Sequence, residues 1–278
     1  MDREGDIRKR LEALAKNDYA PPEGVSTAEL TWEILPLLGS TDGMLREQYV
    51  YGTLHRWIVR RTLHSDAIVE LAQALVDEEH LFLGIAAPNS DSIYMRSFSV
   101  LLLAPIVYAH RQDPFLSPSD LDRILMRTIE YLDRERDLRG YVSQETWWAH
   151  GVAHAADVLG QLAQCGELSA EPLHAMLGAL ARAALTETDV FIFEEDTRMA
   201  SAAIEILRRT ELDPTQIADW TAQLVPEARW TGELPRVHHR FLNARNVLRC
   251  LYFQGRKAEL PDAIFGEIES ALNALPDR

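Results

Sequence analysis

The sequence predicts an all-α protein in which neighbouring helices run antiparallel, either as a curved α/α superhelix (a HEAT-like solenoid) or as an open helical bundle. Nearly every segment of the 278-residue chain repeats its apolar residues with a helical period. Strand-like alternation is scarce, and glycine and proline fall between the periodic segments. A repeat of about 30 to 50 residues is not evident, so both architectures stay open.

The apolar periodicity defines a series of helices along the chain. Ser117 or Ser119 is the expected N-cap of one of them, and Pro214 stands at the first-turn position of another. The stretches 82–91 and 228–237 lack helical periodicity and are expected to be loops. We expect helices over residues 3–16, 27–38, 43–62, 65–77, 91–111, 119–135, 144–165, 169–186, 195–210, 214–224, 238–254 and 262–274.

Composition and charge narrow the class of protein. A hydrophobic fraction of 47% and a charged fraction of 26% are ordinary for a globular chain, and we expect one all-helical domain over residues 1–278. The net charge of -15 argues against a nucleic-acid or anionic-membrane partner, because phosphate binding needs a basic face. The charged start is not a signal peptide, and the longest apolar run, Val100–Ala109, is shorter than the about 20 residues of a membrane span. We therefore expect a cytoplasmic protein.

The chain has two cysteines, Cys165 and Cys250. They form neither a metal-binding spacing nor a disulfide framework. The chain also lacks a nucleophile elbow, a phosphate-binding loop and a dinucleotide fingerprint. The sequence predicts no cofactor.

The predicted helix 144–165 carries an unusual set of polar residues. On a helical wheel its apolar side chains gather on one side, as is usual for a core face. The other side carries a narrow polar stripe: His150, His154, Asp157 and Gln161. A solvated stripe normally carries several charges, whereas this one carries only Asp157, so we expect it to face other protein or a cavity.

The two histidines of this stripe allow three interpretations. They are core histidines that tie helices together, or they line a ligand pocket, or they bind a metal with Asp157. Histidines four apart share a metal in metalloprotease helices, but the glutamate that follows the first histidine there is Gly151 here. We also expect His154 to interact with Asp157, three residues on, which would fix the imidazole tautomer and raise the pKa of the ring.

Two arginines near this helix are candidates for fixed ion pairs. Arg139 precedes Gly140, which suits a turn into the histidine helix, and Arg139 would then clamp a carboxylate at the start of that helix. Arg96 lies inside an apolar, aromatic stretch, so its guanidinium needs a fixed partner.

A second acidic cluster opens a later helix. Glu195 and Asp196 stand at its start, where negative charge is favourable. Arg198, on the first turn, pairs either outward with these acids or inward with Asp157.

Three separated segments resemble the signature segments of the bacterial family catalogued as domain of unknown function 2785. They are "DSIYMRSFSVLLL", "DLRGYVSQETWWAHGVAHAADVLGQLA" and "EEDTRMASAAIEIL", which begin at Asp91, Asp137 and Glu194. Trp147 stands where the family pattern has glycine, which would narrow whatever space the helix borders. The resemblance implies an all-helical bacterial cytoplasmic protein with its core at about residues 40–255 and capping helices at both ends; it supplies no activity.

These patterns lead to one preferred function and one alternative. We expect a non-catalytic binding scaffold whose polar groove holds a small polar ligand or a protein partner, because helical arrays mostly bind and no nucleophile stands within reach of a base. The alternative is an acid/base or metal-assisted hydrolase that uses His150, His154 and Asp157. The residues expected to converge on the groove are Arg96, Arg139, Trp147, His150, His154, Asp157, Glu195, Asp196 and Arg198.

Overall fold

The computed structural model describes residues 3–276 except 86, 88 and 226–229. Over these residues the chain is all-α, as predicted, with one short hairpin. The α-helices are α1 (Arg3–Lys16), α2 (Thr27–Ile34), α3 (Gly52–Val59), α4 (Ser65–Leu75), α5 (Ser92–Gln112), α6 (Pro118–Arg134), α7 (Gly151–Ala163), α8 (Ala170–Ala184), α9 (Glu195–Leu207), α10 (Pro214–Leu224), α11 (Arg236–Lys257) and α12 (Asp262–Asn273). A 3₁₀ helix η1 (Leu35–Gly39), a π-helix η2 (Met44–Tyr51) and strands β1 (Tyr141–Ser143) and β2 (Trp147–Trp148) complete the fold.

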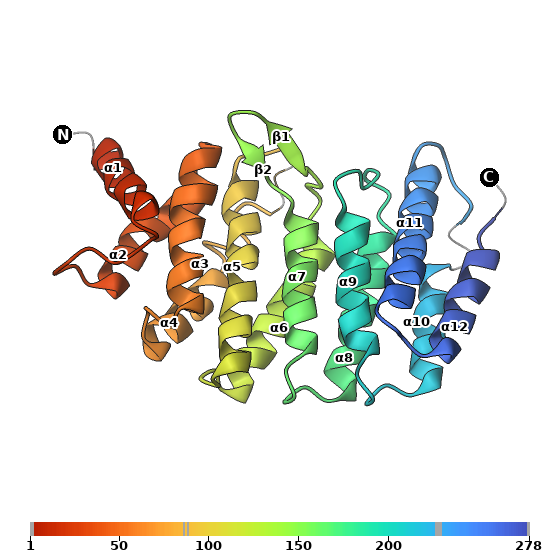
Figure 1. The fold of residues 1–278 in the computed structure, drawn as a ribbon. Coiled ribbons are helices and arrows are strands. Elements are labelled where there is room, and N and C mark those ends of the chain that lie inside the picture. Colours follow the sequence, from red (N-terminus) through yellow and green to blue (C-terminus); the bar gives the residue numbers. More distant parts are fainter. Residues whose placement is uncertain (1–2, 86, 88, 226–229, 277–278) are drawn as a thin grey trace.

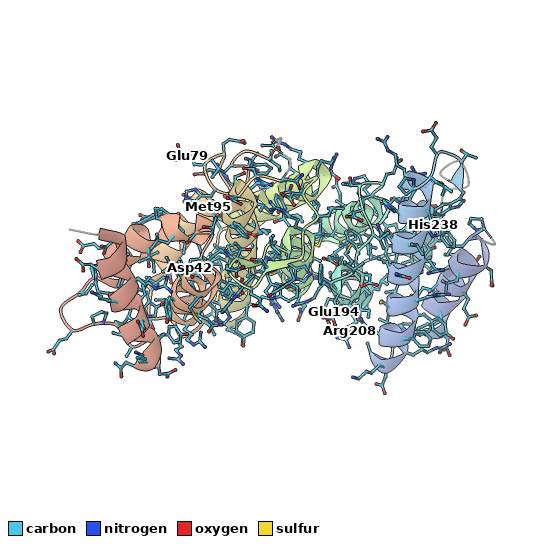
Figure 2. The ribbon with its side chains drawn as sticks, turned by 90° about the horizontal axis from the view of Figure 1, so that it is seen from above. Asp42, Glu79, Met95, Glu194, Arg208 and His238 are labelled. Atoms are coloured by element: carbon cyan, nitrogen blue, oxygen red, sulfur yellow. The ribbon has the colours of Figure 1, made fainter. Side chains whose placement is uncertain are left out.

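The helices form an elongated array with the two termini at opposite ends (Figure 1). In one layer α3, α5, α7, α9 and α11 each pack against the next, and α6, α8 and α10 lie behind them. Neighbouring helices of the two layers run in opposite directions, as in α6 with α7 and α8 with α9. Figure 2 shows side chains filling the space between the helices. Helices α5, α7 and α9 run in the same direction (Figure 1). The segments that lead into them therefore lie at one edge of the array, which we call the loop edge.

Helix α5 is a largely buried helix near the middle of the array. It packs against η1, α3, α4 and α7, and most of its residues are buried. By length and composition it is, within the described parts of the chain, the single helix apolar enough to cross a membrane, but 78% of its apolar window is buried inside the protein. The core helix of a globular protein has the same composition, so α5 is weak evidence for a membrane span.

Two helix starts follow the sequence signals. Ser117 caps α6: its hydroxyl accepts from the Asp120 backbone amide, and the Asp120 carboxylate accepts from the Ser117 amide. Asp213 caps α10 in the same reciprocal way with Gln216. Of the two candidate caps at α6, Ser117 is therefore the correct one.

The predicted helix 144–165 is wrong over its first seven residues. The chain there forms the antiparallel hairpin of β1 and β2, and α7 begins only at Gly151. Trp147 and His150 have left-handed backbones, with φ of 55° and 60°, which a continuous right-handed helix does not allow. Strand β2 is only two residues long, so it leaves no alternating pattern in the sequence. The helical period of the apolar residues therefore continues across the hairpin.

A buried arginine holds the hairpin in place. Arg46, on η2, donates to the carbonyl oxygens of Thr146 and Trp148, and its neighbour Glu47 accepts from the Trp148 amide at 3.1 Å. The Arg46 guanidinium lies 4.2 Å from the ring centre of Tyr94 and 4.7 Å from that of Phe98, both on α5. These contacts outweigh the local helical preference of the segment.

Trp147 packs on Gly43, next to η2. A side chain at position 43 would place its Cβ 2.5 Å from Cγ of the indole, so only glycine leaves room for this tryptophan. The expectation that Trp147 narrows the space beside the histidine helix is therefore wrong. Its left-handed backbone is a conformation that glycine adopts readily and other residues adopt rarely.

Gly43→Ala is expected to lower the free energy of unfolding by about 1 to 3 kcal/mol, because the added methyl group overlaps the Trp147 indole. Urea unfolding followed by circular dichroism measures the change. Gly166→Ala is the matched control, since nothing lies within 4 Å of the position of its added Cβ. Equal stability of the two variants would contradict the packing described here.

Candidate functional site

Two adjoining pockets lie on the face formed by α3, α5, α7 and α9. The histidine pocket, of about 570 Å³, is lined by His150, His154, Trp148 and Phe193 among others. The aspartate pocket, of about 610 Å³, is lined by Asp157 together with residues further along the same helices. Both pockets share the side chains of Tyr51, Leu101 and Arg198, so they adjoin each other along α7; we call the two together the groove.

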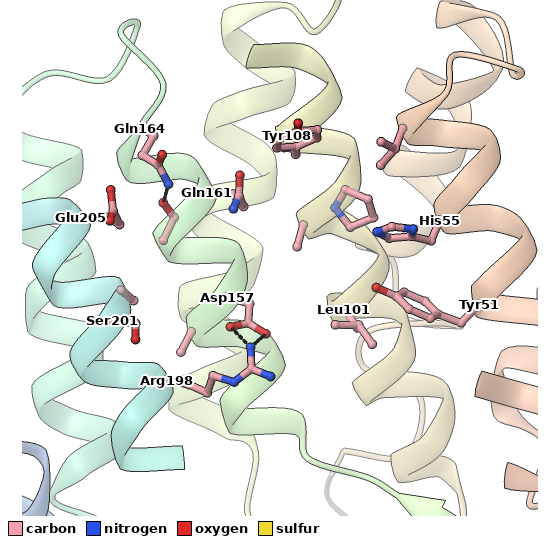
Figure 3. A pocket seen from close by; sticks show the side chains of 16 residues that line it. Tyr51, His55, Leu101, Tyr108, Asp157, Gln161, Gln164, Arg198, Ser201 and Glu205 are labelled. Carbon is pink, nitrogen blue, oxygen red and sulfur yellow. Dashed lines mark hydrogen bonds and ion pairs between the residues drawn. The ribbon is translucent and has the colours of Figure 1, made fainter. Parts of the chain in front are cut away.

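The polar stripe predicted on the histidine helix runs along this groove. His150 and His154 line the histidine pocket, and Asp157, Gln161 and Gln164 line the aspartate pocket. Figure 3 shows the aspartate pocket between Tyr51, His55 and Leu101 on one side and the α7 and α9 side chains on the other. The stripe thus faces a cavity, one of the two surroundings expected for it.

His154 is buried and neutral. Its Nδ1–H donates to the backbone carbonyl of Ser97 on α5 at 3.1 Å, which leaves Nε2 as the acceptor nitrogen. Its ring meets the edge of Phe98, with 5.6 Å between ring centres. Burial, and to a smaller degree the nearby His150, lowers the pKa of His154 to about 3. The predicted pairing with Asp157 and the predicted rise in pKa are both wrong, because the ring turns towards α5.

His150 is the N-cap residue of α7 and joins the hairpin to α9. Its Nε2–H donates to the Phe193 carbonyl at 2.7 Å and lies 3.3 Å from Oε1 of Glu195. Its ring stacks on Trp148 with 5.1 Å between ring centres. The hydrogen bond from His150 lowers the pKa of Glu195 against the opposing effect of burial. The two histidines therefore each tie α7 to a different neighbour.

Asp157 pairs inward with Arg198, one of the two arrangements left open by the sequence. Arg198 Nη1 lies 2.8 and 2.9 Å from the two carboxylate oxygens (Figure 3). Burial raises the pKa of Asp157, and the arginine offsets part of that rise. Burial, with the charge of Asp157, also raises the pKa of Tyr51 to about 12, so this hydroxyl is a hydrogen-bond donor at neutral pH.

The predicted convergence of nine residues on one groove is wrong for five of them. Arg96 is fully buried and donates through Nε and Nη2 to Glu135, the fixed partner that its apolar surroundings demanded. Arg139 pairs with Asp137, not with a carboxylate at the start of α7. None of the five lines either pocket of the groove: Arg96, Arg139, Trp147, Glu195 and Asp196.

The groove also contains residues that the sequence analysis missed. Glu47, Tyr51 and Leu101 line it from η2 and α5, and Phe193 and Glu194 line it from the segment before α9. Burial raises the pKa of the Glu47 carboxyl against the effect of Arg46. The stretch around Glu47 looks like an ordinary amphipathic helix in the sequence, so only the spatial neighbourhood identifies it.

The histidines do not assemble a metal centre with their neighbours. Among residues 3–276, leaving out the positions not described, no group of three or more histidine, cysteine, aspartate or glutamate side chains is close enough to hold a metal ion. Both imidazoles donate an N–H to a backbone carbonyl, and Asp157 pairs with Arg198.

Comparison with known proteins gives a family but no activity. Residues 81–253 match the family described as "Protein of unknown function (DUF2785)". The chain belongs to this family. The match includes α5, the hairpin, α7 and α9, and it agrees with the resemblance of the three segments. No curated protein and no solved structure matches the chain.

Arg96→Met is expected to cost about 3 to 5 kcal/mol of stability, because it leaves the Glu135 carboxylate buried without its partner. Arg182→Met is the control: it breaks an ion pair with Asp133 whose side chains are 53% and 39% exposed, and about 0 to 1 kcal/mol is expected. Guanidinium unfolding compares the two. A loss at Arg96 no larger than that at Arg182 would refute a structural role for the buried pair.

His154 is expected to make stability fall as the pH is lowered. Since the folded-state pKa is about 3 and the unfolded value is near 6.5, only the unfolded chain takes up this proton between the two values. The contribution is complete above the unfolded pKa and decreases by about 1.4 kcal/mol for each pH unit below it, down to the folded pKa.

Urea unfolding between pH 8 and pH 5 tests this dependence. His154→Asn, whose amide can donate to Ser97 in place of Nδ1, is expected to remove that part of the slope. His64→Asn, at an exposed position, is the control and is expected to leave the slope of stability against pH unchanged. An unchanged slope in His154→Asn would show that the buried ring is not the titrating group.

Proposed function

We propose that the protein is a non-catalytic binding scaffold whose groove holds a small polar molecule. The observation that carries this proposal is that two adjoining pockets follow the polar stripe of α7. Pockets of several hundred Å³ with a few convergent polar groups are typical ligand sites. Two further parts of the proposal are that the array is a helical-repeat scaffold and that it works in the bacterial cytoplasm, a reducing compartment that suits its free cysteines, Cys165 and Cys250.

The polar groups of the groove favour a ligand with hydrogen-bond donors at one end. The Nε2 atom of His154 is an acceptor without a partner among the described residues, and Glu47 adds a carboxylate to the same pocket. The other end of the groove offers mixed groups: the Asp157–Arg198 ion pair and the Gln161 amide. A small molecule with an amine or hydroxyl group at the histidine end fits this distribution.

The protonation states favour binding over the alternative acid/base hydrolase. A general base works best with a pKa near neutrality, whereas His154 has a pKa of about 3. Asp157, which would orient the base, is engaged by Arg198. The Cys165 thiol is buried and its pKa is raised to about 11, so it is a poor nucleophile.

A thermal-shift screen of amines, amino acids, sugars and carboxylic acids, followed by calorimetry on the hits, tests this function. Ser201→Trp is expected to abolish binding, because Ser201 is exposed at the wall of the aspartate pocket and a tryptophan there fills it. Met126→Trp is the control, at a position 53% exposed on α6, outside the groove. Hits that bind both variants equally well would place the ligand elsewhere and refute the proposal.

A further inference from the structure

A separate pocket is lined by residues of α11 and α12. These two helices stand at the C-terminal end of the array (Figure 1). Its volume is about 650 Å³. We call it the terminal pocket; its walls include Phe241, Arg245, Arg249, Tyr252, Phe253 and Glu269. None of these residues lines the groove described above, so the terminal pocket is independent of the proposed function.

Two arginines of the terminal pocket lack the partners that most arginines of this chain have. Arg245 and Arg249 stand one turn apart on α11, and neither forms a hydrogen bond or ion pair within the described part of the chain. The Nε atom of Arg245 is buried without an acceptor. By contrast, Arg256 on the same helix pairs with Asp262 of α12.

This unpaired charge needs an explanation in a strongly acidic protein. The chain has 43 acidic residues against 28 basic ones, yet no carboxylate is within ion-pair distance of Arg245 or Arg249 among the described residues. Burial and the charge of Arg249 both lower the pKa of Arg245, so the two guanidinium groups repel each other. A bound oxyanion would accept from both and remove the repulsion.

The rest of the pocket suits an aromatic group. The Arg245 guanidinium lies 5.2 Å from the ring centre of Phe241. Phe253 lines the pocket beside Tyr252. The Phe253 side chain is 71% exposed, which leaves a large apolar surface in contact with water. An exposed aromatic side chain next to two unpaired arginines favours a planar ligand that carries a negative group.

We infer that the terminal pocket binds a small aromatic oxyanion, with its phosphate or carboxylate between Arg245 and Arg249 and its ring against Phe253. Calorimetry of the full chain with phenyl phosphate and with benzoate tests the two oxyanions. Inorganic phosphate and phenol test the charged group and the ring separately. Binding of at least one aromatic oxyanion, at one site per chain and more tightly than inorganic phosphate or phenol, is expected.

Variants identify the site. Arg249 is exposed. The Arg249→Gln substitution is expected to weaken binding about tenfold or more, because it removes one charge-assisted contact. Arg123→Gln is the matched control: it removes the same charge from an exposed position on α6 and leaves affinity unchanged. Phe253→Ser is expected to weaken phenyl phosphate but not inorganic phosphate.

Three results would overturn the inference. The first is no binding of either aromatic oxyanion to the parent protein at millimolar concentration. The second is undiminished affinity in Arg249→Gln, or an equal loss in Arg249→Gln and Arg123→Gln. The third is inorganic phosphate binding as tightly as phenyl phosphate, which would remove the role of the aromatic wall. The circular dichroism spectrum of Arg249→Gln is the control for folding. If it is unchanged, a loss of affinity is due to the pocket and not to unfolding.

Discussion

The buried guanidinium of Arg46 is the contact on which the loop edge depends. It lies against two aromatic rings of α5 and donates to backbone carbonyls of the hairpin, 100 and 102 residues further along the chain. A single cation therefore fixes the position of Trp148, and through it the stacking of His150. Because the guanidinium is fully buried, each lost acceptor would leave a desolvated donor, and the arrangement is strongly determined.

The polar residues near α7 divide into two groups with different physical roles. Those that donate to backbone carbonyls or to fully buried carboxylates, such as His150 and Arg96, join neighbouring helices in the interior. Others line the groove, and of these His154 has a ring nitrogen, Nε2, without a partner among the described residues. His150 and His154 belong to both groups, since each bonds to a backbone carbonyl of a neighbouring segment and also lines the histidine pocket.

Much of the fold follows from the sequence, because most helices bury one face and their apolar period is plain. The caps at Ser117 and Asp213 are local, and local signals predict them well. The hairpin could not be predicted, since the groups that stabilise it belong to η2. The partner of His154 is equally hidden: it is a backbone carbonyl on α5, and no residue type marks it.

The parallel orientation of α5, α7 and α9 gives the groove a direction. Their N-terminal ends all lie at the loop edge, so their peptide dipoles add and the partial positive charge collects there. The carboxylates of Glu47 and Glu135 near this edge already pair with Arg46 and Arg96, so they do not cancel that partial charge. Any molecule lying along α7 therefore experiences an electric field of fixed sense, and its two possible orientations differ in energy even where its shape would permit both.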